Sequence, residues 1–358
     1  MRNEGENMFK SIKIKNLRAI TELEIDNLGQ VNIFVGQNSC GKTTLLEAIF
    51  FLIGATNPKL PVRANIFRDF PFLSIQLWPT YFHNMDTDLP IEIVGQTRDT
   101  MERQHLLIQP RRHNSRAVES LTSDLESRKV VPTNAEPITE LNGLELEYTS
   151  SHNPNEKIMS CVYLKKDKLI DEGAKDRPIR GIFVNPLTLA DWKDRFDAVQ
   201  QKKLVPQVVF LLKKIEPRMS DLRLNKIGLL SADIGLPQLI PANLLGGGIA
   251  KCLSIALAML DYKDGIVLID EIENGLHHST QQKIWEAIIN WAQELNVQVF
   301  ATTHSNECVK AFNDSIDTTL FKSEAKLFRI ERKDEKFRAV EYNQELLSES
   351  LESKWEVR

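Results

Sequence analysis

The chain has 358 residues, of which 42% are hydrophobic and 26% are charged, the composition of a soluble globular protein with a sizeable core. Its 45 Lys and Arg residues and 49 Asp and Glu residues give a net charge of −4, which excludes bulk positive charge as a reason to bind nucleic acid. The four cysteines form no CxxC pair, which speaks against a disulfide framework or a zinc site. Because the sequence shows no apolar leader and no run long enough to span a bilayer, we expect a cytoplasmic protein without membrane contacts.

The front of the chain predicts short strands followed by one helix. Residues 1–8 read as a disordered tail, and the alternating segments 11–17 and 21–28 predict strands. The apolar run 31–36 predicts a buried strand that ends in glycine, and residues 42–53 predict the helix that follows it.

The middle of the chain predicts a second sheet. Residues 57–90 show no pattern that predicts a helix or a strand. Four strand-like segments with an antiparallel pattern then follow, at residues 91–95, 105–109, 144–150 and 158–166. They predict a sheet separate from a parallel core. The polar residues 110–141 predict an exposed loop or arm, and residues 187–224 predict helices that are interrupted near Pro206 and end at Pro217.

From residue 265 onward, strands and helices alternate as in a parallel sheet with crossover helices. Residues 266–271 and 297–303 predict the strands, and residues 281–295 predict the helix between them. A further helix is expected from Ser305. Residues 326–343 predict a hairpin before a last helix.

The segment GQNSCGKT, residues 36–43, matches the GxxxxGK[ST] phosphate loop and stands between a predicted strand and a predicted helix. Its glycines let successive backbone N–H groups turn toward phosphate oxygens, and the helix start adds its positive dipole end. Lys42 supplies a charge for the β and γ phosphates, and Thr43 supplies a hydroxyl for Mg²⁺. The predicted ATP-binding residues are Gly36, Gln37, Asn38, Ser39, Cys40, Gly41, Lys42, Thr43 and Thr44. The position of Cys40 at a helix N-terminus also predicts thiolate character, so that its alkylation would block ATP binding.

Two further strand ends carry groups that suit ATP hydrolysis. The apolar residues 266–269 lead into Asp270, a candidate Mg²⁺ ligand, and Glu271, a candidate general base for the attacking water. His304 follows the strand at 299–303, and we expect it to donate a hydrogen bond beside the γ phosphate. The plainer interpretations are a solvated strand end for the carboxylates and a turn or cap group for the histidine.

Three glycines stand before an apolar, helix-like segment, although glycine inside a helix is less favourable than Ala by about 1 kcal/mol. A helix start without side chains leaves N–H groups free to bind a second anion. Because residues 36–43 already cradle one triphosphate, this second site predicts that two copies meet and close each other's nucleotide. The residues assigned to it are Leu245, Gly246, Gly247, Gly248 and Lys251. The alternative is a tight loop packed against a neighbouring segment.

These four motifs, in this order, resemble the ABC-type ATPases. More narrowly, they resemble the stand-alone ATPases of the overcoming-lysogenization-defect (OLD) group, relatives of the SMC and RecF proteins. The matching text is IKIKNLRAITELEIDNLGQVNIFVGQNSCGKTTLLEAIFFL, IPANLLGGGIAKCLSIALAML, GIVLIDEIENGLHHSTQQKIWEAI and VFATTHSNE. The resemblance implies an α/β P-loop NTPase fold of ABC type, with a mixed core sheet, an antiparallel β subdomain and a helical insertion. It places an N-terminal lobe at residues 9–96, the insertion at 97–240 and a C-terminal lobe at 241–358.

The resemblance also implies that ATP is held between two protomers, with the signature loop of one acting on the nucleotide of the other. In these terms residues 36–43 are Walker A, Asp270 and Glu271 are Walker B, residues 273–277 are the D-loop region and His304 is the switch histidine. The signature, residues 245–248, departs from the pattern: Asn243 and Gly247 replace the usual Ser and the frequent Asp. This departure puts the rate of hydrolysis in question more than the binding. Gln76 and His83 are the Q-loop candidates.

Two functions follow as hypotheses. The first is an ATPase that forms homo-oligomers and regulates a separate effector, such as a nuclease or toxin in anti-phage defence. It is based on the short sequence after His304, about fifty residues, which is too short for the Toprim domain of OLD nucleases.

The alternative is a RecF- or SMC-like DNA-binding ATPase in repair. Its candidate phosphate contacts are Arg98, Arg103, Arg111, Arg112 and Arg116. A solvated charged arm explains these arginines as well. Assigning the chain as a small GTPase, a kinase or a transporter subunit would leave more of the motifs unexplained.

Overall fold

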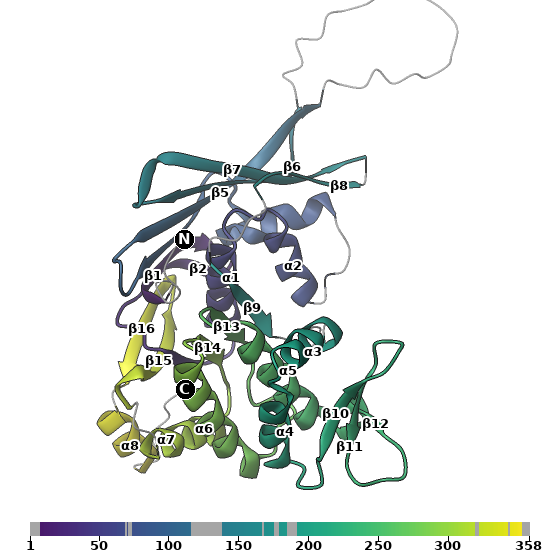
Figure 1. Ribbon diagram of the computed structural model, residues 1–358. Coiled ribbons are helices and arrows are strands. Elements are labelled where there is room, and N and C mark those ends of the chain that lie inside the picture. The colour runs from purple at the N-terminus through teal and green to yellow at the C-terminus, as the bar shows by residue number, and fades with distance from the viewer. Residues whose placement is uncertain are drawn as a thin grey trace, which may run out of the picture.

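The computed structural model describes residues 8–68, 70, 74–115, 138–166, 168–174, 179–184, 192–318, 322–342 and 344–352. Of the sequence predictions, the tail up to residue 7 and Arg116 lie outside these residues. An antiparallel sheet forms one layer of the molecule, and a mixed sheet covered by helices forms the other (Figure 1). The fold is the α/β arrangement that the motifs implied.

The antiparallel sheet has seven strands in the order β2-β1-β4-β5-β6-β7-β8. They are β1 (Phe9–Leu17), β2 (Ile20–Ile25), β4 (Ile91–Thr97), β5 (Arg103–Ser115), β6 (Ile138–Ser150), β7 (Asn153–Lys165) and β8 (Lys168–Gly173). The predicted separate sheet is therefore confirmed, and the first two strands of the chain belong to it. The predicted boundary between residues 96 and 97 falls inside this continuous sheet, because β4 pairs with β5.

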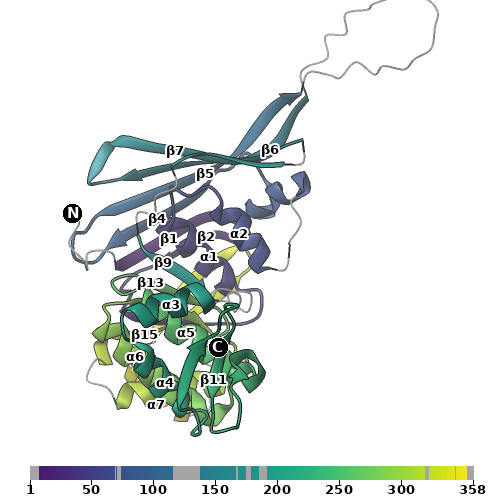
Figure 2. The same ribbon diagram turned by 45° about the vertical axis from the view of Figure 1, so that its right-hand side comes forward.

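Residues 110–141 were predicted to form an exposed loop or arm, and the described part of this segment is an arm made of two paired strands. β5 and β6 continue pairing as far as Ser115 and Ile138, and together they project from the body as a long arm (Figure 2). Strand pairing uses backbone hydrogen bonds, so an exposed two-stranded ribbon needs no apolar side chains. For this reason the polar sequence gave no sign of the strand pairing.

The mixed sheet has six strands in the order β16-β15-β3-β14-β13-β9. They are β3 (Val31–Val35), β9 (Gly181–Val184), β13 (Ile266–Ile269), β14 (Gln298–Thr302), β15 (Ala325–Lys333) and β16 (Lys336–Tyr342). All neighbours are parallel except the predicted hairpin β15–β16. Residues 97–240, which the sequence assigned to an insertion, thus also supply an edge strand of this core, β9.

Each central strand is buried on both faces, which is why its sequence is continuously apolar. In β3, Ile33 and Val35 belong to one hydrophobic cluster and Phe34 belongs to the other. In β13, Val267 and Ile269 alternate in the same way with Leu268. The mixed sheet therefore forms the partition between two cores.

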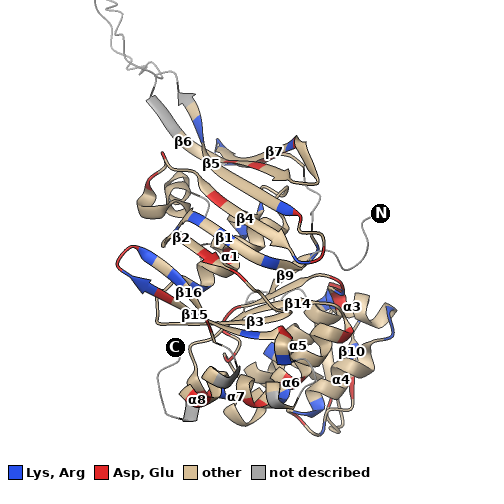
Figure 3. Ribbon diagram, turned by 90° about the vertical axis from the view of Figure 1, so that its left-hand side faces the viewer, with Lys and Arg blue, Asp and Glu red and all other residues tan. Residues whose placement is uncertain are grey.

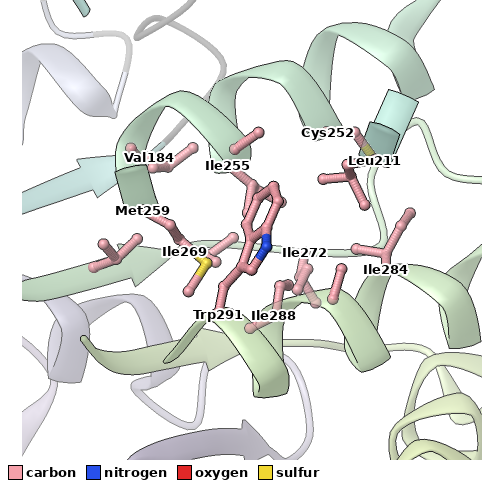
Figure 4. Packing of buried hydrophobic residues seen from close by; sticks show 14 of the residues in the cluster. Val184, Leu211, Cys252, Ile255, Met259, Ile269, Ile272, Ile284, Ile288 and Trp291 are labelled. Carbon is pink, nitrogen blue, oxygen red and sulfur yellow. The ribbon is translucent and has the colours of Figure 1, made fainter. Parts of the chain in front are cut away.

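The helices cover this sheet on both faces. They are α1 (Lys42–Ile53), α2 (Leu60–Phe67), α3 (Trp192–Gln201), α4 (Val205–Lys213), α5 (Gly247–Asp261), α6 (His278–Glu294), α7 (Asn306–Asp317) and α8 (Gln344–Glu352). Helix α1 contacts strands of both sheets and so lies between them. On the other face, Ile255 of α5 and Ile288 of α6 pack around Trp291 and Ile269 (Figure 4).

Short elements complete the chain. They are the 3-10 helices η1 (Ile75–Tyr81), η2 (His83–Met85), η4 (Ala242–Leu245) and η5 (Lys322–Glu324), and a small sheet of β10 (Asp221–Leu224), β11 (Leu230–Asp233) and β12 (Ile240–Pro241). The prediction of helices that are interrupted near Pro206 and end at Pro217 agrees with α3 and α4, and the residues after Pro217 form β10, which pairs with β11. Among the residues that the structure describes, every helix is too short or too polar to cross a bilayer.

A buried ion cluster fixes α1 to the surrounding loops. Glu47, in the middle of α1, has a side chain that is only 2% exposed. Its carboxylate accepts hydrogen bonds from Arg18 at 2.8 Å and from Arg68 at 2.5 Å. A buried charge is tolerated only when it is paired, so the two arginines and Glu47 depend on one another.

Glu47→Gln is expected to lower the free energy of unfolding by about 3 kcal/mol, because it leaves two guanidinium groups without their buried counter-charge. Chemical denaturation measures the change. Glu294→Gln, at an exposed position on α6, is the matched control and should unfold like the wild type. Equal stability of the two variants would contradict a structural role for the cluster.

Candidate functional site

The phosphate loop runs from the end of β3 into α1 and depends on two glycines. Gly36 has a φ of +147°, and a Cβ at this position would lie 2.5 Å from the carbonyl oxygen of Ile330. Gly41, directly before α1, has a φ of +92°, which L residues rarely adopt. A side chain at either position would deform the loop, so the motif's glycines are required by backbone geometry.

Lys42 folds back over this loop. Its ammonium group donates to the carbonyl oxygens of Gly36 at 2.6 Å and Gln37 at 2.9 Å. Burial lowers the pKa of Lys42, and the neighbouring thiol of Cys40 opposes this shift. The charge thus lies inside the curl of the loop, where a phosphate chain would enter.

Cys40 does not have the environment that the sequence predicted. Its side chain is buried, and burial raises the pKa of the Cys40 thiol even though the Lys42 ammonium lies 3.7 Å away. Burial therefore opposes the thiolate character that the position at a helix start predicted for Cys40. The effect of its alkylation on ATP binding stays a prediction.

The end of β13 meets α1 and β14 at the carboxylate of Asp270. The hydroxyl of Thr43 donates to it at 3.1 Å and the hydroxyl of Thr302 at 2.6 Å. Burial raises the pKa of Asp270, and these two hydrogen bonds oppose the rise. The hydroxyl and carboxylate oxygens are the hard donors that Mg²⁺ prefers, so Thr43 and Asp270 fit the ion.

Glu271 and His304 lie together beside this junction. The imidazole Nε2 of His304 is 3.6 Å from Oε1 of Glu271, and the Glu271 side chain is 45% exposed. Glu271 has a φ of +44°, its N–H donates to Thr302 at 2.9 Å, and its carboxylate accepts from Asn274. The sequence paired the two residues in function, and the structure places them in contact range.

One residue of this group was not assigned a separate role from the sequence. Glu273 accepts a hydrogen bond from the backbone N–H of His304 at 2.7 Å, which ties the end of β14 to the segment after β13. In the sequence it was assigned only to the D-loop region, residues 273–277, two residues after Glu271.

A cavity of about 500 Å³ opens over the phosphate loop. Its lining includes Asn38, Ser39, Gly41, Lys42, Thr43, Thr44, Glu271 and His304, all predicted from the sequence. Arg18, Arg68 and Arg332 also line it, and sequence reasoning missed all three. Gln37 and Cys40 line an adjoining cavity of about 400 Å³ next to β15. The size and positive charge fit a nucleoside triphosphate.

The signature residues lie outside the phosphate-loop cavity of their own chain. Leu245, Gly246, Gly247 and Gly248 are absent from its lining. Gly246 and Gly247 are exposed, and no side chain caps the N-terminus of α5. The phosphate loop and the uncapped start of α5 therefore lie at separate places on the chain.

Lys251 is placed differently from the sequence prediction. Its side chain turns inward and donates to the backbone carbonyl oxygens of Asp270 at 2.8 Å and Glu271 at 3.3 Å, so it adds no charge to an exposed anion site. The residue is 8% exposed. Burial lowers the pKa of Lys251, and the carboxylate of Asp270 opposes the shift.

The Q-loop candidates also lie outside the cavity. Gln76 is in η1, and His83 interacts instead with the carbonyl of Arg18 at 2.9 Å and with Glu335 at 3.2 Å.

Three of the arginines that the sequence proposed as DNA contacts have partners within the chain. Arg98 donates to Glu324 at 2.6 Å, Arg111 stacks on Tyr163 and Arg112 pairs with Asp88 at 3.0 Å. Basic and acidic residues are intermixed over the antiparallel sheet rather than separated (Figure 3).

Two family profiles match the sequence. One, described as AAA domain, matches residues 11–216, more than half of the chain. The other, described as AAA ATPase domain, matches residues 187–309. Together they span both the phosphate loop and the acidic end of β13.

Individual relatives are more distant. A Helicobacter pylori protein named ATP/GTP phosphatase is 24% identical over 365 residues, covering 92% of this chain and 94% of that protein. The DNA replication and repair protein RecF of Lactococcus lactis subsp. lactis is 54% identical over 44 residues, only 12% of either chain.

Among solved structures, an SMC head bound to the C-terminal winged-helix domain of ScpA has a TM-score of 0.53 at 12% identity. The similarity covers 96% of this chain and 99% of that one. At this identity the likeness establishes the fold alone. The profile that covers more than half of the sequence, together with this fold, shows that the chain belongs to the AAA domain family and has the ABC-type P-loop ATPase fold of SMC heads.

Proposed function

We propose that this chain hydrolyses ATP at the cavity over residues 36–44. The observation that carries the proposal is the placement of Glu271 and His304, 3.6 Å apart, on the wall of a cavity whose floor is the phosphate loop. The relative named ATP/GTP phosphatase, similar over 92% of this chain, supports hydrolysis as the reaction.

The roles of the residues follow from their positions. Lys42 and the loop N–H groups would bind the β and γ phosphates, and Thr43 with Asp270 would hold Mg²⁺. Mg²⁺, when bound, supplies positive charge that offsets the charge of the phosphates. Glu271 would accept a proton from the attacking water, and His304 would donate a hydrogen bond to the γ phosphate. Arg18 and Arg68 add positive charge to the cavity, held in place by Glu47.

We further propose that the active unit is a dimer in which the signature loop of one protomer completes the cavity of the other. The exposed, uncapped start of α5 carries this proposal, because its N–H groups are available to an anion but lie outside their own cavity. An isologous dimer would form two equivalent composite sites.

The proposed physiological role is regulation of a separate effector in anti-phage defence. This role is taken from the OLD-like ATPases, whose motifs the sequence resembles. It is supported by that resemblance alone. DNA binding is consistent with the RecF similarity, but the arginines described above are already paired, so the ATPase dimer is the function that the geometry supports best.

Glu271→Gln is expected to slow ATP hydrolysis by roughly 10²–10⁴-fold while leaving ATP affinity intact, since it removes the general base and keeps the shape of the side chain. Phosphate release and fluorescent-nucleotide titration measure the two quantities. The control is Glu156→Gln on the exposed face of β7. Wild-type turnover in the Glu271 variant would reject the assigned role.

Mixing two inactive variants tests whether the signature acts in trans. Lys42→Ala removes the phosphate contact, and Gly247→Asp places a negative charge on the exposed helix start. An equimolar mixture should regain activity, up to about a quarter of the wild-type rate, because half of the dimers are mixed and each has one intact composite site. If the signature served its own protomer, the mixture would stay inactive.

A further inference from the structure

Lys251 bridges the signature helix and the catalytic loop of the same chain. It lies in the first turns of α5, and its ammonium group donates to the carbonyl oxygens of Asp270 and Glu271. These two carbonyls belong to the peptide groups on either side of the Cα atom of Glu271. A single side chain thus holds both peptides that orient the proposed general base.

The backbone of Glu271 needs such support. Its φ of +44° lies in the left-handed region, which is unfavourable for a residue with a Cβ. The conformation persists only where the surroundings fix it, and here the surroundings are Thr302, Asn274 and Lys251. Of these three, only Lys251 comes from the signature helix.

A second contact joins the same two segments. A Cβ added at Gly248 would lie 2.7 Å from the carbonyl oxygen of Gly275, and one added at Gly275 would lie 3.0 Å from the carbonyl carbon of Gly247. Gly275 itself has a φ of +78°. The signature loop and the segment after Glu271 are therefore in backbone-to-backbone contact, which is possible only because both positions are glycine.

We propose that Lys251 is a positioning residue for Glu271, and that Lys251 with the Gly248–Gly275 contact transmits the state of the signature loop to the catalytic carboxylate of the same protomer. This inference rests on the proposed function. A ligand that engages the signature loop from the partner side would shift α5 at its start, and both contacts would carry that shift to residues 270–275. Binding in one composite site would then set the geometry of the general base in the other.

Lys251→Met keeps the length of the side chain and removes its donors. We expect turnover to fall about 10²-fold, the loss associated with misplacing a catalytic group by about 1 Å, with KM and nucleotide affinity unchanged. The control is Lys263→Met, an exposed lysine just beyond α5. Because Lys251 would act through Glu271, the variant carrying both Lys251→Met and Glu271→Gln should hydrolyse ATP no more slowly than Glu271→Gln alone. An additive loss in the double variant, or wild-type turnover in Lys251→Met, would overturn the inference.

Gly248→Ala tests the second contact without nucleotide. Gly247→Ala is its matched control, because a Cβ at Gly247 meets only the Cα atom of Gly275, at an ordinary 3.7 Å. Hydrogen exchange of the backbone amides of residues 270–276 in nucleotide-free protein should accelerate in Gly248→Ala and in Lys251→Met, and should stay at the wild-type rate in Gly247→Ala. Equal exchange in all variants would reject the connection.

The two proposals fail separately. If the wild type hydrolyses no nucleotide, the proposed function is lost, whereas the exchange experiment still reports on the contacts. If Glu271→Gln abolishes turnover while Lys251→Met and Gly248→Ala leave turnover and exchange unchanged, the ATPase stands and the connection is rejected.

Discussion

The hydrogen bonds that converge on the Asp270 carboxylate hold the nucleotide-binding part of the molecule together. They connect the first turn of α1 through Thr43 and the end of β14 through Thr302. A buried carboxylate without donors would be strongly destabilising, so these hydroxyls are required where they stand. The parallel order of β3, β14 and β13 brings the ends of these strands to one edge of the sheet. The site is thus a consequence of topology, and its residues come from segments more than two hundred positions apart in the sequence, because the hydrogen bond from Thr43 to Asp270 spans 227 positions.

Local patterns in the sequence predicted the parts of this arrangement that depend on neighbouring residues. The phosphate loop, the acidic end of β13 and the histidine after β14 each have a short signature, and the apolar runs before them predicted buried strands. Arg18, Arg68 and Arg332 had no such signature. They reach the cavity because loops that are distant in sequence come together there. One sequence does not show which strands pair, so it does not show which loops come together. The strand pairing within the polar arm of β5 and β6 was missed for a related reason, since backbone hydrogen bonds hold an exposed ribbon together.

Lys251 shows how a correct local inference can lead to the wrong partner. The sequence assigned Lys251, together with residues 245–248, to an anion site at the start of the helix. On a helix, residues three apart share a face, so Lys251 lies on the same side of α5 as Gly248. The structure agrees with that geometry, because Gly248 contacts Gly275 and Lys251 contacts Asp270 and Glu271. The face itself, however, is turned toward residues 270–275 of the same chain. Helical periodicity fixes which residues act together, and only the tertiary packing of α5 against the core decides what they meet.

The three glycines of the run therefore stand in three different environments. Gly246 adopts a φ of +100° before α5, Gly247 is exposed, and Gly248 leaves room for the carbonyl of Gly275. The two interpretations of this run, an anion-binding helix start and a tight loop packed on a neighbour, are consequently compatible, because successive positions on a helix point in different directions. The apolar Leu245 before the run offers no hydroxyl to a phosphate. Any attraction for a partner's nucleotide would then come from backbone N–H groups, whose direction is set by the same packing that holds Gly248 against Gly275. In this chain, the proposed binding of the partner's nucleotide and the proposed positioning of Glu271 in the same protomer would depend on one backbone conformation.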